Sequence, residues 1–504
     1  RNSNASCCRL PLWLYGATRA QGCGRGLSLS ASHQDLQQRL GELLPRVIDN
    51  CTALAKLERL SGGASQETYR ITIDTQDGVS TLAMRRAAGG EEGEITAQHP
   101  GLAAEAKLMQ VARAHGVPEP KIYHVLQPED GMGAGFIMQW LDGEALGARI
   151  VKAPELDAVR PKLAYLFGET LARIHSIDLV TTQLDQHLQH QSPEQYVRQT
   201  WERYQALDTP QPMIDFTAQW LLANLPSSYT PSLVHNDYRN GNVMVDQNGI
   251  VAVLDWEVAH IGDPMRDLGW MLTHSWRFGR AHLPVGGFGE VADFFAGYEA
   301  VSGQSVDHQA VKFWQVFGSF WWAVGCLGMA EHYRNGPDQS VERPGIGRRS
   351  SECQIDCVNL LIPGPVTLAE AQGSTGLVDM PRADELLQSV IDFLREQVMS
   401  ETTGRTQFLS RVASNSLDIV QRELALGEVA AHYERAGLQA LLNSDDEDLI
   451  ELRWQLVGGL RDERIALDAP GLAAHLRGCV ANQINIDQPR YPGLATALRG
   501  GEGV

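Results

Sequence analysis

Residues 233–255 read LVHNDYRNGNVMVDQNGIVAVLD, and this stretch decides how the middle of the chain folds. Two short apolar runs flank Asn248-Gly249, and Asn-Gly is a strong hairpin signal because both positions tolerate positive φ. A hairpin returns the chain to the place where it started. Since Asn242 precedes the first run and Asp255 follows the second, the sequence predicts that these two side chains are neighbours.

The polar residues around this hairpin have the order and spacing of a phosphoryl-transfer site. His235-x-Asp237-x-x-x-x-Asn242 followed by Asp255 is the arrangement of enzymes that move a phosphoryl group from ATP to a hydroxyl. An amide oxygen and a carboxylate are hard ligands, which predicts Asn242 and Asp255 as ligands of Mg²⁺ carrying ATP phosphates. Asp237 can take the proton from an acceptor hydroxyl. The alternative is an ordinary hairpin with polar flanks.

The composition is that of a globular protein with room for two or three domains. The chain has 504 residues, of which 43% are hydrophobic, and a formal net charge of −19. In the absence of a long basic stripe, this charge argues against a nucleic-acid partner, and it would suit a cationic acceptor. The apolar stretch 313–330 is interrupted by Gln315 and Ser319, which favours a buried core helix over a membrane span. The eight cysteines lack zinc spacing, so we expect reduced thiols in a cytoplasmic protein.

A hairpin with a glycine-rich turn is predicted upstream. The pattern indicates strands at 68–74 and 80–86, and the turn Ser61-Gly62-Gly63 before them could lay its backbone N–H groups over phosphates. A plain turn is the alternative. This part of the chain is therefore a candidate nucleotide site.

Arg85 and Arg86 end the second of these strands and lie on opposite faces of it. A strand cation can hold the α- and β-phosphates, and we expect Arg85 to do so, although both could be solvated edge charges. Glu105 lies in the first turn of a helix predicted at 103–115. There its carboxylate favours the helix dipole and can also pair with Arg85.

Two further groups lie downstream of the hairpin. Asp263-Pro264 predicts the start of a helix, and Asp267, near its N-terminus, could brace the catalytic loop or lie in solvent. Arg343, Arg348 and Arg349 form a compact basic cluster. It is either an anion site that binds the acceptor or a loose surface patch.

Changes in composition divide the chain into five predicted segments. They are a disordered or non-native N-terminus (1–32), a small β-rich lobe (33–140), a helical lobe with the catalytic core (141–361), a Pro/Gly-bearing linker (362–380) and a helical accessory domain (381–504). The accessory domain shows no nucleophile–base pair and no metal spacing. We therefore expect it to pack on the rest of the protein, and a chain ending near Gly364 to fold without it.

Residues 50–365 resemble the aminoglycoside phosphotransferase/choline kinase-like superfamily. The motifs that carry the resemblance are Leu60-Ser61-Gly62-Gly63, Glu105, His235-x-Asp237-x4-Asn242, Leu254-Asp255-Trp256-Glu257 and Gly262-Asp263-Pro264-x-x-Asp267-Leu268. Within this superfamily, residues 253–264 are most similar to kinase domains fused or adjacent to acyl-CoA dehydrogenases, a branch that includes kinases of 4-hydroxyacyl-CoA. Residues 380–500 resemble a small helical family of unknown function that accompanies such kinases.

The resemblance implies an α+β, bilobal protein-kinase-like fold, with a small β-rich N-lobe, a mainly helical C-lobe and a separate C-terminal α-helical domain. It also implies ATP and Mg²⁺ as cofactors. The family more often has Gly where this chain has Asn236, and we expect that side chain to face away. The strand cation is Arg, where many kinases have Lys, and Arg binds phosphate in a different geometry.

Three functions compete at this point. The first is an ATP-dependent kinase of a hydroxyl on an acyl-CoA thioester, which the basic cluster favours because CoA is anionic. The second is a kinase of an aminoglycoside, choline or a polyol, which the net charge favours. The third is a non-catalytic pseudokinase. The intact set of Asp237, Asn242 and Asp255 argues against the third.

Overall fold

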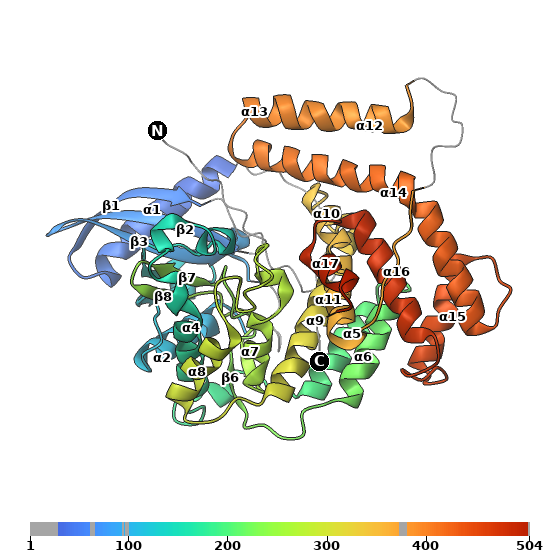
Figure 1. The fold of residues 1–504 in the computed structure, drawn as a ribbon. Helices are drawn as coiled ribbons and strands as arrows, with labels where there is room; N and C mark the ends of the chain where they lie inside the picture. Colours follow the sequence, from blue (N-terminus) through green and yellow to red (C-terminus); the bar gives the residue numbers. More distant parts are fainter. Residues whose placement is uncertain (1–28, 61–65, 93–94, 96–99, 372–380, 502–504) are drawn as a thin grey trace.

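The computed structural model describes the chain except for residues 1–28, 61–65, 93–94, 96–99, 372–380 and 502–504. Figure 1 shows a β-rich lobe at one end, a mainly helical lobe in the middle and a second set of helices at the other end. The α+β, kinase-like bilobal prediction is confirmed by this arrangement. The predicted disorder at 1–32 falls largely outside the described residues, and helix α1 begins at Leu29, before the expected start of the small lobe at 33.

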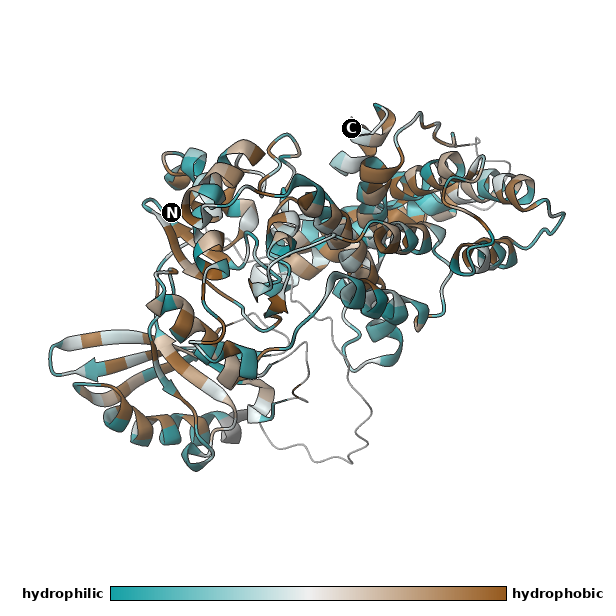
Figure 2. Ribbon diagram, turned by 90° about the horizontal axis from the view of Figure 1, so that it is seen from below, coloured by the Kyte–Doolittle hydropathy of each residue, from teal (hydrophilic) through white to brown (hydrophobic). Residues whose placement is uncertain are grey.

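The small lobe is a five-stranded antiparallel sheet in the order β1-β2-β3-β5-β4. Its elements are α1 (Leu29–Val47), β1 (Cys51–Arg59), β2 (Gln66–Thr75), β3 (Gly78–Ala87), α2 (Leu102–Ala114), β4 (Ile122–Val125) and β5 (Gly135–Gln139). Apolar and polar residues alternate along the strands, as Figure 2 shows. One face of the sheet packs against α1, where Leu40 and Leu44 meet Ile71 and Met84.

The C-lobe is built around one long helix. Its helices of seven or more residues are α4 (Arg160–His175), α5 (Pro193–Gln205), α6 (Pro212–Ala223), α7 (Met265–Met271), α8 (Val291–Ser302), α9 (His308–Asn335), α10 (Glu342–Arg348) and α11 (Ser350–Leu361). Helix α9 carries the apolar stretch 313–330, and its Trp and Phe side chains are buried against α5, α6 and α7. No helix in the described ranges has the length and apolarity that a membrane crossing requires.

The predicted hairpin forms as β7 (Val243–Asp246) and β8 (Gly249–Val253). Val243 pairs with Val253, and the Leu254 amide donates to the Asn242 carbonyl at 2.7 Å. Asn242 and Asp255 therefore occupy adjacent positions at the open end of the hairpin. The short strands β6 (Ser232–Val234) and β9 (His260–Gly262) pair next to it and carry the chain into and out of this region.

The C-terminal helices are α12 (Ala383–Asp392), a π-helical turn (Phe393–Val398), α13 (Met399–Glu401), α14 (Gly404–Leu442), α15 (Leu449–Arg461), α16 (Leu472–Asp487) and α17 (Pro492–Leu498). They do not have an independent core. One continuous apolar core joins Phe216 of α6 and Val358 of α11 to Leu438, Leu456 and Leu476 of the C-terminal helices. This shared core argues against the expectation that a chain ending near Gly364 folds, because that truncation would expose the C-lobe side of the core.

The predicted linker also belongs partly to this interface. Val366 and Leu368 pack against the shared core, and the Ala369 amide donates to Asn482 Oδ1 at 2.6 Å. The rest of it, 372–380, lies outside the described residues. The first half of the stretch is thus held against α16 rather than free.

Candidate active site

The strand cation lies where the two lobes meet. Arg85 lies on β3, between β2 and β5, and its Nη2 is 2.5 Å from Asp255 Oδ1. Its Nη1 is 3.1 Å from Glu105 Oε1, and Nη2 is also 3.4 Å from Glu257 Oε2. Arg86 instead contacts Met132 O at 2.6 Å within the small lobe. Of the two candidate cations, Arg85 is the one that the structure brings to Glu105 and Asp255.

Three carboxylates around one guanidinium shift each other's proton affinity. Burial would lower the pKa of Arg85, but the charges of Glu105, Asp255 and Glu257 outweigh it and raise that pKa. Burial raises the pKa of Glu105 to about 7 and the pKa of Glu257 well above its usual value. Burial would also raise the pKa of Asp255, but the Arg85 charge outweighs it and lowers that pKa. Arg85 and Asp255 therefore keep their charges, whereas burial favours the neutral form of Glu257.

Asp237 lies on the loop before the hairpin and is fully buried. Its Oδ1 accepts hydrogen bonds from Arg239 Nε at 3.0 Å and from Trp270 Nε1 at 2.8 Å. The amide nitrogen of Asn242 donates to its Oδ2. Burial raises the pKa of Asp237, although the Arg239 charge opposes this. A carboxylate with a raised pKa is a better proton acceptor for an alcohol.

His235 links the loop to the hairpin. Its Nδ1 accepts a hydrogen bond from the Asp237 amide at 3.2 Å, and its Nε2 lies 3.1 Å from the Leu254 carbonyl oxygen. The ring also packs against Trp256, with centroids 4.6 Å apart. Burial lowers the pKa of His235, which favours a neutral ring with its proton on Nε2. In this geometry His235 supports the loop and presents no polar atom to a substrate.

Asp267, on α7, reaches back to the loop. Its Oδ2 accepts from the His235 amide at 2.8 Å, and its Oδ1 accepts from the Asn236 amide at 2.7 Å. His175 Nε2 lies 3.1 Å from the same Oδ2. Burial would raise the pKa of Asp267, but the His175 contact outweighs it and lowers that pKa. A charged carboxylate therefore fixes two consecutive backbone amides just before Asp237.

Asn236 does not face away, contrary to expectation. Its backbone has φ of 70°, a left-handed conformation that asparagine tolerates better than most residues. The side chain is 3% exposed and hydrogen-bonded to Tyr196 and Arg266. The sequence contains the signal for the backbone, because the family more often has Gly here. It contains no local signal for the buried partners.

Two charged residues at the site escaped the sequence reasoning. Arg239 contacts Asp237, and its guanidinium carbon lies 4.2 Å from the ring centroid of Trp276. Glu257 contacts Arg85, as given above. Arg239 lies two residues after Asp237, and Glu257 lies two residues after Asp255. This proximity in sequence could have identified both as site residues.

The residues at the end of the hairpin fit a magnesium ion chemically. Asn242 uses its amide nitrogen to hold Asp237, at 3.0 Å from its carbonyl oxygen, which leaves Oδ1 as the ligand atom. Asp255 has φ of 70°, a strained conformation typical of functional positions. No group of three or more His, Cys, Asp or Glu in the described chain could hold a metal alone. Mg²⁺ would therefore take its other ligands from nucleotide phosphates and water.

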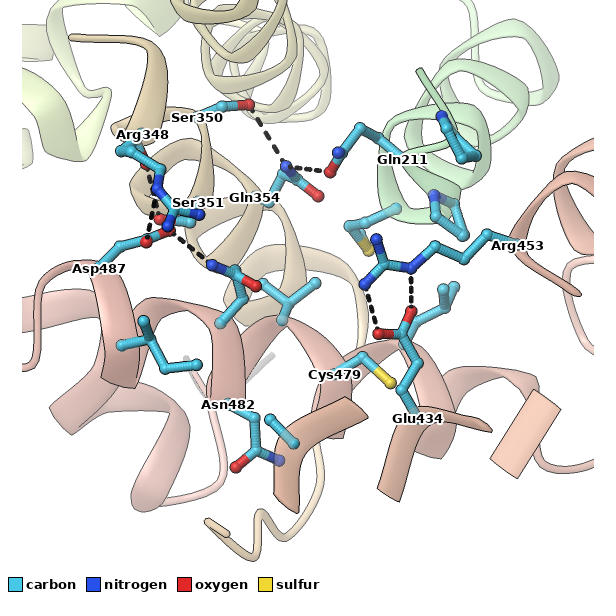
Figure 3. A pocket seen from close by; sticks show the side chains of 18 of the residues that line it. Gln211, Arg348, Ser350, Ser351, Gln354, Glu434, Arg453, Cys479, Asn482 and Asp487 are labelled. Carbon is cyan, nitrogen blue, oxygen red and sulfur yellow. Dashed lines mark hydrogen bonds and ion pairs between the residues drawn. The ribbon is translucent and has the colours of Figure 1, made fainter. Parts of the chain in front are cut away.

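The predicted acceptor-binding arginines are all engaged with carboxylates. Arg343 Nε lies 2.8 Å from Asp338 Oδ2, and Arg349 Nη2 lies 3.0 Å from Glu352 Oε2. Arg348 pairs with Glu423 of α14 and with Asp487 of α16, at the wall of a cavity of about 360 Å³ between the C-lobe and the C-terminal helices. Figure 3 shows Arg348 beside Asp487 there. The cluster is thus a set of structural ion pairs, two of which connect Arg348 to the C-terminal helices.

The glycine-rich turn cannot be placed. Ser61, Gly62 and Gly63 lie outside the described residues, between β1, which ends at Arg59, and β2, which begins at Gln66. Gln66 itself contacts the site, because it accepts from Arg85 and its Nε2 donates to Glu257 Oε2 at 3.2 Å. The predicted turn therefore directly precedes a strand whose first residue contacts Arg85.

Comparison with known proteins agrees with this geometry. Residues 56–303 match the phosphotransferase enzyme family, and this range includes Arg85, Asp237, Asn242 and Asp255. This segment is similar to that family. Residues 400–491 match a domain of unknown function, DUF6285. The phosphotransferase segment therefore ends before α9, and the second match lies within the helices that share a core with it.

Individual proteins are also similar to this chain. Acyl-CoA dehydrogenase family member 10 of Mus musculus is 28% identical over 44% of this chain and 20% of its own length. Acyl-CoA dehydrogenase family member 11 of Pongo abelii is 24% identical over 83% of this chain and 57% of its own length. This chain therefore matches at most about half of either relative. A putative aminoglycoside phosphotransferase from Ralstonia eutropha has the same fold, with a TM-score of 0.52, 22% identity and coverage of 63% of this chain and 95% of that one.

Proposed function

We propose that the protein is a phosphotransferase that uses ATP and Mg²⁺ to phosphorylate a hydroxyl group of a small molecule. The observation that carries the proposal is the hairpin β7–β8, which sets Asn242 beside Asp255 and leaves Asp237 on the loop before it. The opposite lobe supplies Arg85, 2.5 Å from Asp255. The family of residues 56–303 supports the same chemistry.

In this proposal each side chain has a defined task. Asp237 takes the proton of the acceptor hydroxyl, and the burial that raises its pKa suits it to that task. Arg85 and Arg239 place positive charge near the phosphates and the transferring group. Asn242 and Asp255 would hold Mg²⁺, which when bound neutralises charge on the phosphates.

For the acceptor we propose a 4-hydroxyacyl-CoA. The support is the similarity of the phosphotransferase segment to proteins named as acyl-CoA dehydrogenase family members. The basic cluster no longer adds to this, because its arginines are paired with carboxylates. The second candidate is a cationic acceptor such as an aminoglycoside or choline, which the net charge of −19 favours.

The decisive experiment measures ADP release from MgATP with a panel of hydroxyacyl-CoAs, choline and aminoglycosides. An acceptor-dependent rate with a hydroxyacyl-CoA supports the proposal, and a rate only with choline or aminoglycosides replaces it by the second candidate. The variant Asp237→Asn tests the role of the proposed base. We expect it to lower kcat by about 10²- to 10⁴-fold while nucleotide binding is retained, because the base acts on the acceptor. An unchanged kcat would refute the role of Asp237.

A further inference from the structure

Every polar atom of Asn236, the residue before the proposed base, is held by a partner. Its amide donates to Asp267 Oδ1 at 2.7 Å, and its carbonyl oxygen accepts from Arg266 Nη2 at 3.4 Å. Its Oδ1 accepts from Arg266 Nε at 3.0 Å, and its Nδ2 donates to Tyr196 Oη at 2.8 Å and to the Val258 carbonyl at 3.2 Å. The peptide that leads into Asp237 is therefore fixed from both sides.

Arg266 is an unusual partner because it is a fully buried cation. Its guanidinium lies among aromatic rings, with the Trp270, Phe317 and Trp321 centroids at 4.8, 5.2 and 5.4 Å from its carbon. Within the described chain it forms no ion pair with a carboxylate, although Tyr196 is a polar neighbour and the charges of Asp267 and Asp237 act on it. Burying a cation in this way is costly, and the ring contacts recover only part of the cost.

The directions of its hydrogen bonds show what the guanidinium does. Two of them go to Asn236, one to the side chain and one to the carbonyl of the Asn236–Asp237 peptide. An apolar side chain of similar volume, such as methionine, could fill the same aromatic pocket but could not make these bonds. Four residues later on the same helix, Trp270 donates to Asp237 Oδ1 at 2.8 Å. The cation therefore acts on the loop and not on packing alone.

We propose that Arg266 and Asn236 are a matched pair of positioning residues that hold Asp237 in the orientation needed to accept the proton of the acceptor. The role in proton transfer rests on the proposed function, whereas the positioning of the loop does not. Glycine at 236 would adopt the same backbone conformation without strain. It would, however, leave Arg266 Nε without its acceptor and remove the side-chain contacts to Tyr196 and the Val258 carbonyl.

The test uses Asn236→Gly, Arg266→Met and the double variant, with ADP release from MgATP and the first acceptor active in the panel. Each single variant is expected to lower kcat by about 10- to 100-fold with less than about a 2-fold change in KM for ATP. The double variant should be no slower than the slower single variant, because both changes break the same contact. The proposal would be overturned if the fold-losses of the two single variants multiplied in the double variant, or if kcat were unchanged in the single variants.

A matched control separates positioning from a general loss of stability. Asn443, at the end of α14, also has a positive φ, of 50°, and is remote in sequence from the loop. Asn443→Gly makes the same substitution in the same backbone region and is expected to leave kcat unchanged. If Arg266→Met does not fold, Asn236→Gly still decides the question, because its backbone is compatible with glycine.

Amide hydrogen exchange tests the positioning independently of any acceptor. In Asn236→Gly the peptide covering 233–240 should exchange at least about 10-fold faster than in the wild type, since the loop loses its side-chain contacts. The same peptide should be unaffected in Asn443→Gly. Unchanged exchange in Asn236→Gly overturns the positioning role even if the protein is an active kinase. Faster exchange in a protein that consumes no ATP upholds the positioning and refutes only the proposed function.

Discussion

The guanidinium of Arg85 contacts carboxylates from both lobes. It contacts Asp255 and Glu257, which follow the hairpin, and Glu105, which lies on α2 of the other lobe. The pairing with Glu105 could be anticipated from the chain, because a strand cation and a helix carboxylate are a familiar combination. The contact with Glu257 could not, since it depends on how the chain turns after β8.

At Asp255, substitution should separate metal-dependent binding from folding. We expect Asp255→Ala to abolish the Mg²⁺-dependent part of ATP binding, because this carboxylate is the principal protein charge on the ion. Titration calorimetry with ATP, with and without Mg²⁺, measures the effect. Asp293→Ala, at an exposed position on α8, is the control. Wild-type MgATP affinity in Asp255→Ala would contradict the assignment.

The buried His260 should make stability depend on pH. Burial lowers its pKa to about 4, whereas an unfolded histidine has a pKa near 6.5. Unfolding therefore takes up a proton between these values, and stability falls as the pH drops from about 6.5 to 4, by about 3 kcal/mol in all. Urea unfolding at a series of pH values should show a shallower dependence for His260→Phe. An equal pH dependence in both proteins would show that His260 is not its cause.

At the scale of elements, α7 works as a clamp on the catalytic loop. Arg266, Asp267 and Trp270 are close in sequence on this one short helix, and each contacts the loop between His235 and Asp237. The start of the helix is fixed as well, because Asp263 Oδ1 accepts from the Met265 amide at 2.9 Å and its Oδ2 accepts from Trp314 at 2.7 Å. The loop geometry thus depends on the anchoring of α7 to α9.

Removing the charge of Asp267 should lower both the free energy of unfolding and kcat. Asp267→Asn keeps the shape but offers one acceptor oxygen to two backbone amides, so one buried N–H group loses its partner. We expect a loss of about 1–3 kcal/mol in the free energy of unfolding and a lower kcat. Urea denaturation and ADP release measure the two effects. Asp293→Asn on the exposed face of α8 should change neither. If Asp267→Asn keeps wild-type stability and kcat, the contacts of Asp267 with the loop are not needed for either.

Prediction from sequence succeeded where the signal was local. The β7–β8 hairpin was predicted because Asn-Gly lies between two apolar runs, and β2 and β3 because their alternation is clear. Strands β1 and β4 were missed, since each is defined mainly by its neighbour in the sheet. Within the predicted helical domain, helix α14 runs from Gly404 to Leu442, and it contacts α15 and α16. Buried partners such as Tyr196 and Arg266 come from distant segments, so no local pattern could identify them.

At the scale of the whole molecule, the C-terminal helices complete the C-lobe. Asp215 on α6 is fully buried and accepts hydrogen bonds from Trp201, Tyr204 and Arg461. Arg461 belongs to α15, so the counterion of a buried C-lobe carboxylate comes from the C-terminal helices. Tyr491 likewise donates to the buried Asp356 of α11 at 2.7 Å. The two parts should therefore unfold together.

Breaking this connection should destabilise the entire chain. Arg461→Met removes the charge that compensates Asp215, and we expect a loss of about 3–5 kcal/mol in the free energy of unfolding, with one transition retained. Tryptophan fluorescence and circular dichroism during urea unfolding would both follow it. Arg464→Met serves as the control, because Arg464 is 67% exposed and pairs only with Asp462. Two separate transitions in the wild type would contradict a shared core.

The shared core also limits how such proteins can recombine. The stretch 362–380 looks like a permissive crossover point because it is rich in Pro and Gly. A crossover there would nonetheless combine Val358 and Phe216 from one protein with Leu438 and Leu456 from another, although these side chains pack in one core. Halves inherited from two different ancestors would fit only if both apolar surfaces had diverged in step. The heritable unit is therefore the pair of segments, even though sequence comparison recognises them as two families.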